Sequence, residues 1–226
     1  MKTFKYQMHT HTAPCSRCGV TTPEQLAEAL RSGGYNGAVL TNHFYGGNTG
    51  ISRALSWDEF VKQYELDYLA CREAAKEYDL DIIFGIEEHI SGGLEILIYG
   101  ITPEVLYAHP ELKIRDFELW HDVITSHGGI VIQAHPYRER AYIAEPKVLP
   151  REWIDGIEVY NAGNLTLMNE RARMYAEANP DLILTSGADT HTPDSVCRAG
   201  IEFNERIRDG AELVRVLKSG SYRLIK

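Results

Sequence analysis

The stretch Met8-His9-Thr10-His11-Thr12-Ala13-Pro14-Cys15 decides how the rest of the chain can be interpreted. It follows the run 4–8, which alternates apolar and polar residues as a short β-strand does. Side chains two positions apart on a strand point to the same side, so His9 and His11 are expected to project together from the end of that strand. Two surface histidines would show the same spacing, and for an isolated pair that interpretation is at least as good.

Further histidines and carboxylates follow later apolar runs, and they favour a common site. They are His43, Glu87, His135, Asp189 and His191. The apolar runs predict strands over 4–8, 36–41, 81–86, 94–99, 130–134, 156–160, 181–185, 201–203 and 222–225. Capping signals and apolar periodicity predict helices over 23–32, 57–78, 114–126, 165–178 and 209–218. Nearly every candidate residue therefore lies at the end of an expected strand.

The alternation of strands and helices indicates a parallel sheet covered by helices. In a closed α/β barrel, functional groups gather at the carboxyl ends of the strands. An open doubly wound sheet collects them around one crevice only. The candidates here are spread over most of the strands, so a barrel is favoured. No Pro/Gly/Ser linker or charge block interrupts the chain, which predicts a single domain over 1–226.

Composition and charge restrict the classes of protein to which the chain can belong. Its 226 residues are 44% hydrophobic and 24% charged, as in ordinary globular proteins. A formal net charge of −9, without a basic patch, argues against a nucleic-acid partner. We find no apolar run long enough for a membrane span and no leader pattern, so a cytoplasmic protein without a membrane partner is expected. Four cysteines without a regular framework fit a reducing compartment.

The chain resembles the PHP (polymerase and histidinol phosphatase) family of metal-dependent phosphoesterases over most of its length. Five motifs stand in the family's order: His-x-His at 9–11, Thr-Asn-His ending at His43 (Thr-Asp-His is commoner), Gly-Ile-Glu ending at Glu87, Ala-His-Pro around His135, and Asp-x-His at 189–191. The resemblance implies an α/β fold of the distorted (β/α)7 TIM-like barrel type.

The resemblance also implies two or three divalent metal ions at the mouth of the barrel. Imidazole and carboxylate ligands suit zinc, iron or manganese alike. The implied ligands are His9, His11, Glu87 and Asp189 for the first ion, Glu87 and His135 for the second, and His43 and His191 for the third.

The chain departs from the family pattern at two positions. Arg17 stands where a histidine often completes the third metal site, and an arginine cannot bind a metal ion. Cys15 or Cys18 would replace it as a thiolate, unless both are ordinary loop cysteines. Glu95 stands where many members have a histidine that binds the second ion. A carboxylate can serve there, although Glu95 would equally fit an exposed edge strand.

The expected function is hydrolysis of a small phosphate monoester by metal-activated hydroxide, as in a histidinol-phosphatase-like enzyme. Arg17 and Arg138 would bind the substrate phosphate, because a guanidinium matches phosphate oxygens, or would be ordinary surface arginines. The residues expected in catalysis are Glu87, Asp189, His191, Arg138 and Arg17. The alternatives are a metal-dependent hydrolase of a non-phosphate bond, similar to amidohydrolases, and a weakly catalytic metal-binding domain.

Overall fold

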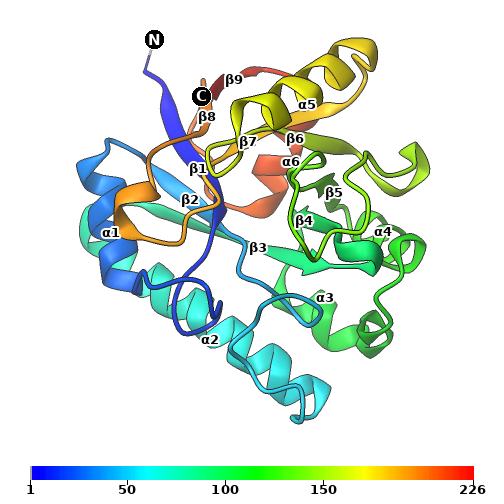
Figure 1. Ribbon diagram of the computed structural model, residues 1–226. Helices are drawn as coiled ribbons and strands as arrows, with labels where there is room; N and C mark the ends of the chain where they lie inside the picture. The colour runs from blue at the N-terminus through cyan, green and yellow to red at the C-terminus, as the bar shows by residue number, and fades with distance from the viewer. Residues whose placement is uncertain (1) are drawn as a thin grey trace.

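Nine strands form one continuous sheet in the computed structural model, which describes residues 2–226 (Figure 1). In chain order they are β1 (Phe4–Thr10), β2 (Gly37–Leu40), β3 (Asp81–His89), β4 (Glu95–Tyr99), β5 (Ile130–Gln133), β6 (Gly156–Asn161), β7 (Ile183–Gly187), β8 (Gly200–Phe203) and β9 (Tyr222–Ile225). The helices within this part of the chain are α1 (Pro23–Ser32), α2 (Trp57–Ala75), α3 (Pro103–Ala108), α4 (Phe117–Ser126), α5 (Thr166–Ala178) and α6 (Gly210–Ser219).

The sheet curls into a nearly closed barrel. Strands β1 to β7 are neighbours in sequence order, and the segment after β7 returns to β1 through a parallel bridge between Thr10 and Thr190. Strand β8 pairs with the first half of β1 and β9 pairs with β8, both antiparallel. The α/β fold of the distorted, TIM-like barrel type is therefore confirmed, with β8 and β9 as additions beside the closure.

Among β1 to β7, one strand runs against the expected parallel sheet. Strand β4 is antiparallel to both β3 and β5. The reason is the short turn at Ser91–Gly93, because a parallel neighbour would need a crossover of a dozen or more residues. Reversal of β4 places its first residue, Glu95, opposite His89 near the end of β3. Glu95 thus reaches the same rim of the barrel as the carboxyl ends of the other strands.

Local sequence explains where the first two long helices begin. Thr22 accepts a hydrogen bond from the backbone N–H of Gln25, whose side chain accepts one from the backbone of Thr22 in return. Ser56 and Glu59 form the same capping box at the start of α2. Such caps satisfy backbone N–H groups that the helix itself leaves free. Both helices therefore start where the sequence predicts.

An apolar layer closes the end of the barrel opposite the rim. Helix α6 packs against β3, β4 and β7, and its Leu213 and Leu217 join a buried cluster with Ile83 and Leu97. Residues at even spacing on a strand face the same side. Glu87, four positions after Ile83 in β3, and Glu95, two positions before Leu97 in the reversed β4, therefore lie on the same side of the sheet as this cluster and nearer the rim. None of the helices over residues 2–226 combines the length and the apolar character that a membrane span needs.

Candidate metal centre

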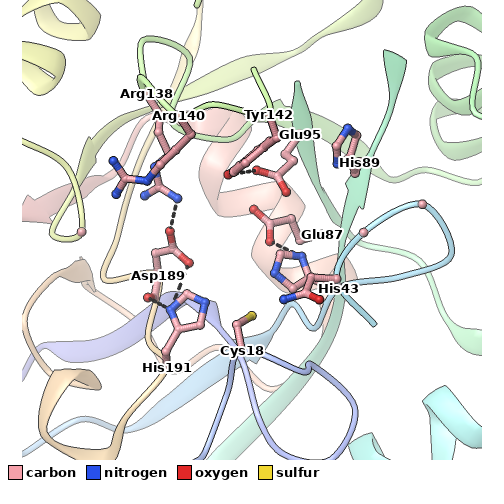
Figure 2. A pocket seen from close by; sticks show the side chains of 14 residues that line it. Cys18, His43, Glu87, His89, Glu95, Arg138, Arg140, Tyr142, Asp189 and His191 are labelled. Atoms are coloured by element: carbon pink, nitrogen blue, oxygen red, sulfur yellow. Dashed lines mark hydrogen bonds and ion pairs between the residues drawn. The ribbon is translucent and has the colours of Figure 1, made fainter. Parts of the chain in front are cut away.

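The carboxyl-terminal rim of the barrel brings together the residues that the sequence singled out as metal ligands. They come from β1 (His9, and His11 just beyond it), from the loop after β2 (His43), from β3 (Glu87), from β4 (Glu95), from the loop after β5 (His135) and from the loop after β7 (Asp189, His191). A cavity of about 580 Å³ is lined by His43, Glu87, Glu95, Asp189 and His191 among them, and its lining side chains are drawn in Figure 2.

Glu87 lies at the centre of this group. Its Oε1 is 3.0 Å from His9 Nε2 and 3.2 Å from His135 Nε2. Its Oε2 is 3.3 Å from His11 Nε2 and 2.9 Å from His43 Nδ1. One carboxylate therefore contacts four imidazoles, two through each oxygen. This is the geometry expected of a carboxylate that bridges two cations.

Two further carboxylates contact the imidazoles. Asp189 Oδ1 lies 3.5 Å from His9 Nε2 and 3.2 Å from His11 Nε2. Glu95 Oε2 lies 3.5 Å from His135 Nε2. The edge-strand alternative for Glu95 does not apply, since its side chain is buried at the rim.

Glu158 in β6 orients His9. Its Oε1 is 3.0 Å from His9 Nδ1, while its Oε2 accepts hydrogen bonds from the backbone N–H of His135 and from Asn161 Nδ2. A carboxylate accepts, so His9 carries its proton on Nδ1 and turns Nε2 toward the centre. Glu158 was not singled out from the sequence. The available signal was a charged residue inside the otherwise apolar run 156–160.

Ser16 orients His11 in the same way. The Ser16 hydroxyl donates to Asn42 Oδ1 at 2.7 Å and accepts from the backbone N–H of His43 at 3.0 Å. Its one proton is used, so at 3.1 Å it must accept from His11 Nδ1. His11 thus also directs Nε2 inward. Asn42 stands at the position where the family motif more often has an aspartate. Its Nδ2 donates a hydrogen bond to Asp67, and an aspartate carboxylate has no N–H with which to do so.

The buried polar atoms at the centre have the properties of metal ligands. Four of them have no hydrogen-bond partner among residues 2–226: His9 Nε2, His11 Nε2, His43 Nδ1 and Glu87 Oε2. Four triplets of potential ligand atoms lie within 4.8 Å of one another. Unpaired buried polar atoms are costly unless they bind something. The residues present therefore fit a cluster of divalent cations.

Burial and charge shift the titration of the carboxylates in opposite directions. Burial raises the pKa of Glu87, but the charges of His9 and His43 lower it by more. The pKa therefore lies well below its usual range. Asp189 behaves in the same way, because His9 and Arg138 offset its burial and lower its pKa. Burial, reinforced by the charge of Glu87, raises the pKa of Glu95 to about 8. Burial thus favours the protonated form of Glu95, and a cation that binds there would displace the proton.

Arg138 lines the cavity, but its guanidinium already interacts with other side chains of the protein. It is 7% exposed, and its Nη1 is 2.5 Å from Asp189 Oδ2. Its Nη2 and Nε donate to the side-chain oxygens of Asn161 and Asn164, both at 2.9 Å. All three nitrogens have partners, so the geometry favours holding Asp189 in place over contact with a substrate phosphate.

Arg17 is the predicted site residue that lies in neither the cavity lining nor the groups of potential ligands. Its side chain is exposed, and the next residue, Cys18, lines the cavity in its place. The exposed guanidinium that does lie on the cavity is Arg140, with Tyr142 beside it (Figure 2). Both are in the loop after His135, which carries no motif, and the sequence offered no signal for either.

Comparison with known proteins gives matches in structure alone. No protein-family model matches the sequence, and no curated protein matches it. Among solved structures, the chain is similar to a two-domain protein from Bacteroides vulgatus that contains a predicted PHP-like metal-dependent phosphoesterase. The identity is 16% and the TM-score 0.72, over 99% of this chain and 64% of that one. The chain thus spans less than two thirds of that protein.

Two other solved structures have the same fold and different descriptions. One is an amidohydrolase from Chromobacterium violaceum with bound sulfate, at 14% identity and TM-score 0.60, over 98% of both chains. The other is Endonuclease Q, in complex with a 27-mer duplex substrate with an abasic lesion at the active site. It is 14% identical, with TM-score 0.65, over 98% of this chain and 58% of that one.

The endonuclease corrects one expectation. Net charge led us to exclude nucleic acid and to restrict the partner to a small phosphorylated molecule, and that inference was wrong, since this fold accommodates a DNA duplex at its active site. Overall charge is a poor guide here, because bound cations set the local field of such a site. The resemblance drawn from the motifs is confirmed for the fold: this chain has the fold of the PHP-like metal-dependent phosphoesterases.

Proposed function

We propose that the chain is a metal-dependent hydrolase of phosphate esters. The observation that supports this most strongly is the convergence of buried, unpaired imidazole nitrogens on the two oxygens of Glu87. Bound divalent cations, zinc, iron or manganese, would supply an activated water and offset negative charge on the phosphoryl group. His9, His11, Glu87 and Asp189 would hold the first, and Glu87, His135 and Glu95 would hold the second.

Other residues of the chain would bind the substrate and orient the metal ligands. Arg140, on the cavity, binds the non-reacting phosphoryl oxygens, and Tyr142 lies beside it. Glu158 and Ser16 hold His9 and His11 in the tautomer that leaves Nε2 free. His191, whose side chain is 34% exposed at the edge of the cavity, or a water on a cation that His191 binds, would assist departure of the leaving oxygen.

Two classes of phosphate ester suit this arrangement. A small phosphate monoester would fit the cavity, with Arg140 on its terminal oxygens. A nucleic-acid strand is the second candidate, favoured by the shared fold with Endonuclease Q and its bound duplex. Hydrolysis of a non-phosphate bond, as the amidohydrolase likeness would suggest, offers Arg140 no phosphoryl group to bind, and is therefore the less favoured reaction.

A substrate panel with matched variants tests the proposal. Protein reconstituted separately with zinc, iron or manganese is assayed on p-nitrophenyl phosphate, bis-p-nitrophenyl phosphate, duplex DNA with an abasic site, and an N-acyl amino acid. We expect turnover of at least one phosphate ester, lost on chelation and in Glu87→Gln. Arg140→Ala should raise KM for the same ester. Turnover of the N-acyl compound alone, or of nothing under any metal, would refute the proposal.

A further inference from the structure

The loop between β1 and α1 is held firmly against the metal centre by backbone hydrogen bonds. The N–H of Arg17 donates to the carbonyl of Asn48 at 2.9 Å, and the N–H of Gly50 donates to the carbonyl of Cys15 at 2.6 Å. The N–H of Val20 donates to the carbonyl of His191 at 2.9 Å. The loop is therefore tied both to the segment after β2 and to the segment after β7.

This arrangement turns one cysteine toward the cavity. Cys18 is half-buried and lines the cavity together with His43 and His191. Figure 2 shows its sulfur pointing into the space between those two imidazoles. Cys15, the other candidate in this loop, is buried and packs in the apolar core beneath the barrel wall. The two loop cysteines thus have different environments, and only the second has access to the site.

The imidazoles around this space point to a ligand independently of the cysteine. His11, His43 and His191 each offer a nitrogen within 4.8 Å of the others. His11 is fully buried, and its Nε2 has no hydrogen-bond partner in the described part of the chain. His191 Nδ1 is 2.8 Å from the backbone carbonyl of Asp189, so it carries the proton and leaves Nε2 free.

We propose that Cys18 binds a cation as a thiolate, together with His43 and His191. This rests on the proposed metal-dependent function and names the ligand that takes the place left by Arg17. On binding, the thiol proton passes to solvent and a sulfur–metal bond forms. A set of two imidazoles and one thiolate is softer than the imidazole and carboxylate sets beside it, and therefore selects Zn²⁺ over Mn²⁺. Three protein ligands leave a fourth position open to water or substrate, as in catalytic zinc sites.

X-ray absorption of the zinc-loaded protein tests this without any substitution. We expect one sulfur per three zinc ions at about 2.3 Å. The cobalt-loaded protein should show thiolate-to-cobalt charge-transfer absorption in the near ultraviolet. Cys18→Ser should abolish that absorption and lower the zinc content from three ions to two. The matched control is Cys197→Ser, because Cys197 is also half-buried but does not line the cavity, and its Sγ lies 3.4 Å from the carbonyl of Ala29.

The outcomes separate this inference from the proposed function. Sulfur absent from the zinc environment, or charge transfer that persists in Cys18→Ser, would overturn the inference. Equal loss of charge transfer in Cys197→Ser would also overturn it, because the sulfur ligand would then lie elsewhere. Sulfur ligation that depends on Cys18, in a protein that turns over no phosphate ester, would support the metal site and refute the proposed function instead.

Discussion

Arg138 offers the sharpest test of how the centre is held together. Its guanidinium is buried against Asp189 and donates to Asn161 and Asn164. Arg138→Met keeps much of the volume and removes the charge, leaving a buried carboxylate without its partner. Breaking a buried ion pair in this way costs about 3–5 kcal/mol. Against a total stability of about 5–15 kcal/mol, that is a large fraction.

The loss should depend on metal. In metal-free protein nothing except the histidines offsets the charge of Asp189, and Arg138→Met should lower the melting temperature by on the order of 10 °C. With zinc bound, the cations offset the same charge, and the decrease should be much smaller. Denaturant unfolding with chelator and with zinc measures both. The control is Arg140→Met, an exposed guanidinium on the same loop, which should change stability by about 0.5 kcal/mol at most.

Two results would refute this account. If Arg138→Met raised KM for a phosphate ester and left unfolding unchanged, Arg138 would be a substrate contact, as the sequence suggested. If the loss of stability were the same with and without zinc, Asp189 would not be a metal ligand. Both measurements use purified variants and need no knowledge of the natural substrate.

Three other substitutions or conditions test the site. Glu87→Gln should lose at least one metal ion by elemental analysis and several decades of turnover, since an amide bridges two cations poorly. Glu88→Gln is its control, because the buried Glu88 side chain accepts a hydrogen bond from the backbone N–H of Gly46 and does not line the cavity. The Glu88→Gln protein should retain its metal ions, whereas the Glu87→Gln protein should lose at least one. Glu158→Gln should weaken zinc binding about 10–100-fold in a competition titration, because His9 loses its orienting carboxylate. Zinc affinity should rise with pH up to about 8, the raised pKa of Glu95, because zinc must displace the proton on that carboxyl. Calorimetry in buffers of different ionisation enthalpy would measure the proton release. An affinity that does not change with pH would contradict the role of Glu95 as a ligand.

The sequence predicted the barrel and the residues at its rim because both depend on local pattern. Apolar runs define strands, and His9, Glu87 and Asp189 follow or end such runs, so strand ends bring them together. The reversal of β4 was missed, although the three residues of the turn before it, 91–93, are too few for a crossover. Strand direction there depended on loop length rather than on strand composition.

What the sequence could not predict was which polar groups pair with one another. Arg138 and Arg140 lie two positions apart in one loop, yet the first is buried against Asp189 and the second is exposed on the cavity. No pattern distinguishes them, because the difference arises from residues distant in sequence. The same holds for Glu158, whose contact with His9 spans the barrel interior.

The segments that close the barrel also carry candidate metal ligands. Two backbone hydrogen bonds join the ends of the first and last barrel strands, from His11 N–H to Thr190 O at 3.1 Å and from Thr190 N–H to His9 O at 3.2 Å. A cation held by His9 and His11 on one side and by Asp189 on the other would be a cross-link between segments far apart in the chain. Amide hydrogen exchange at His11 and Thr190 should therefore slow when metal binds, so that occupancy of the centre governs how often the barrel opens.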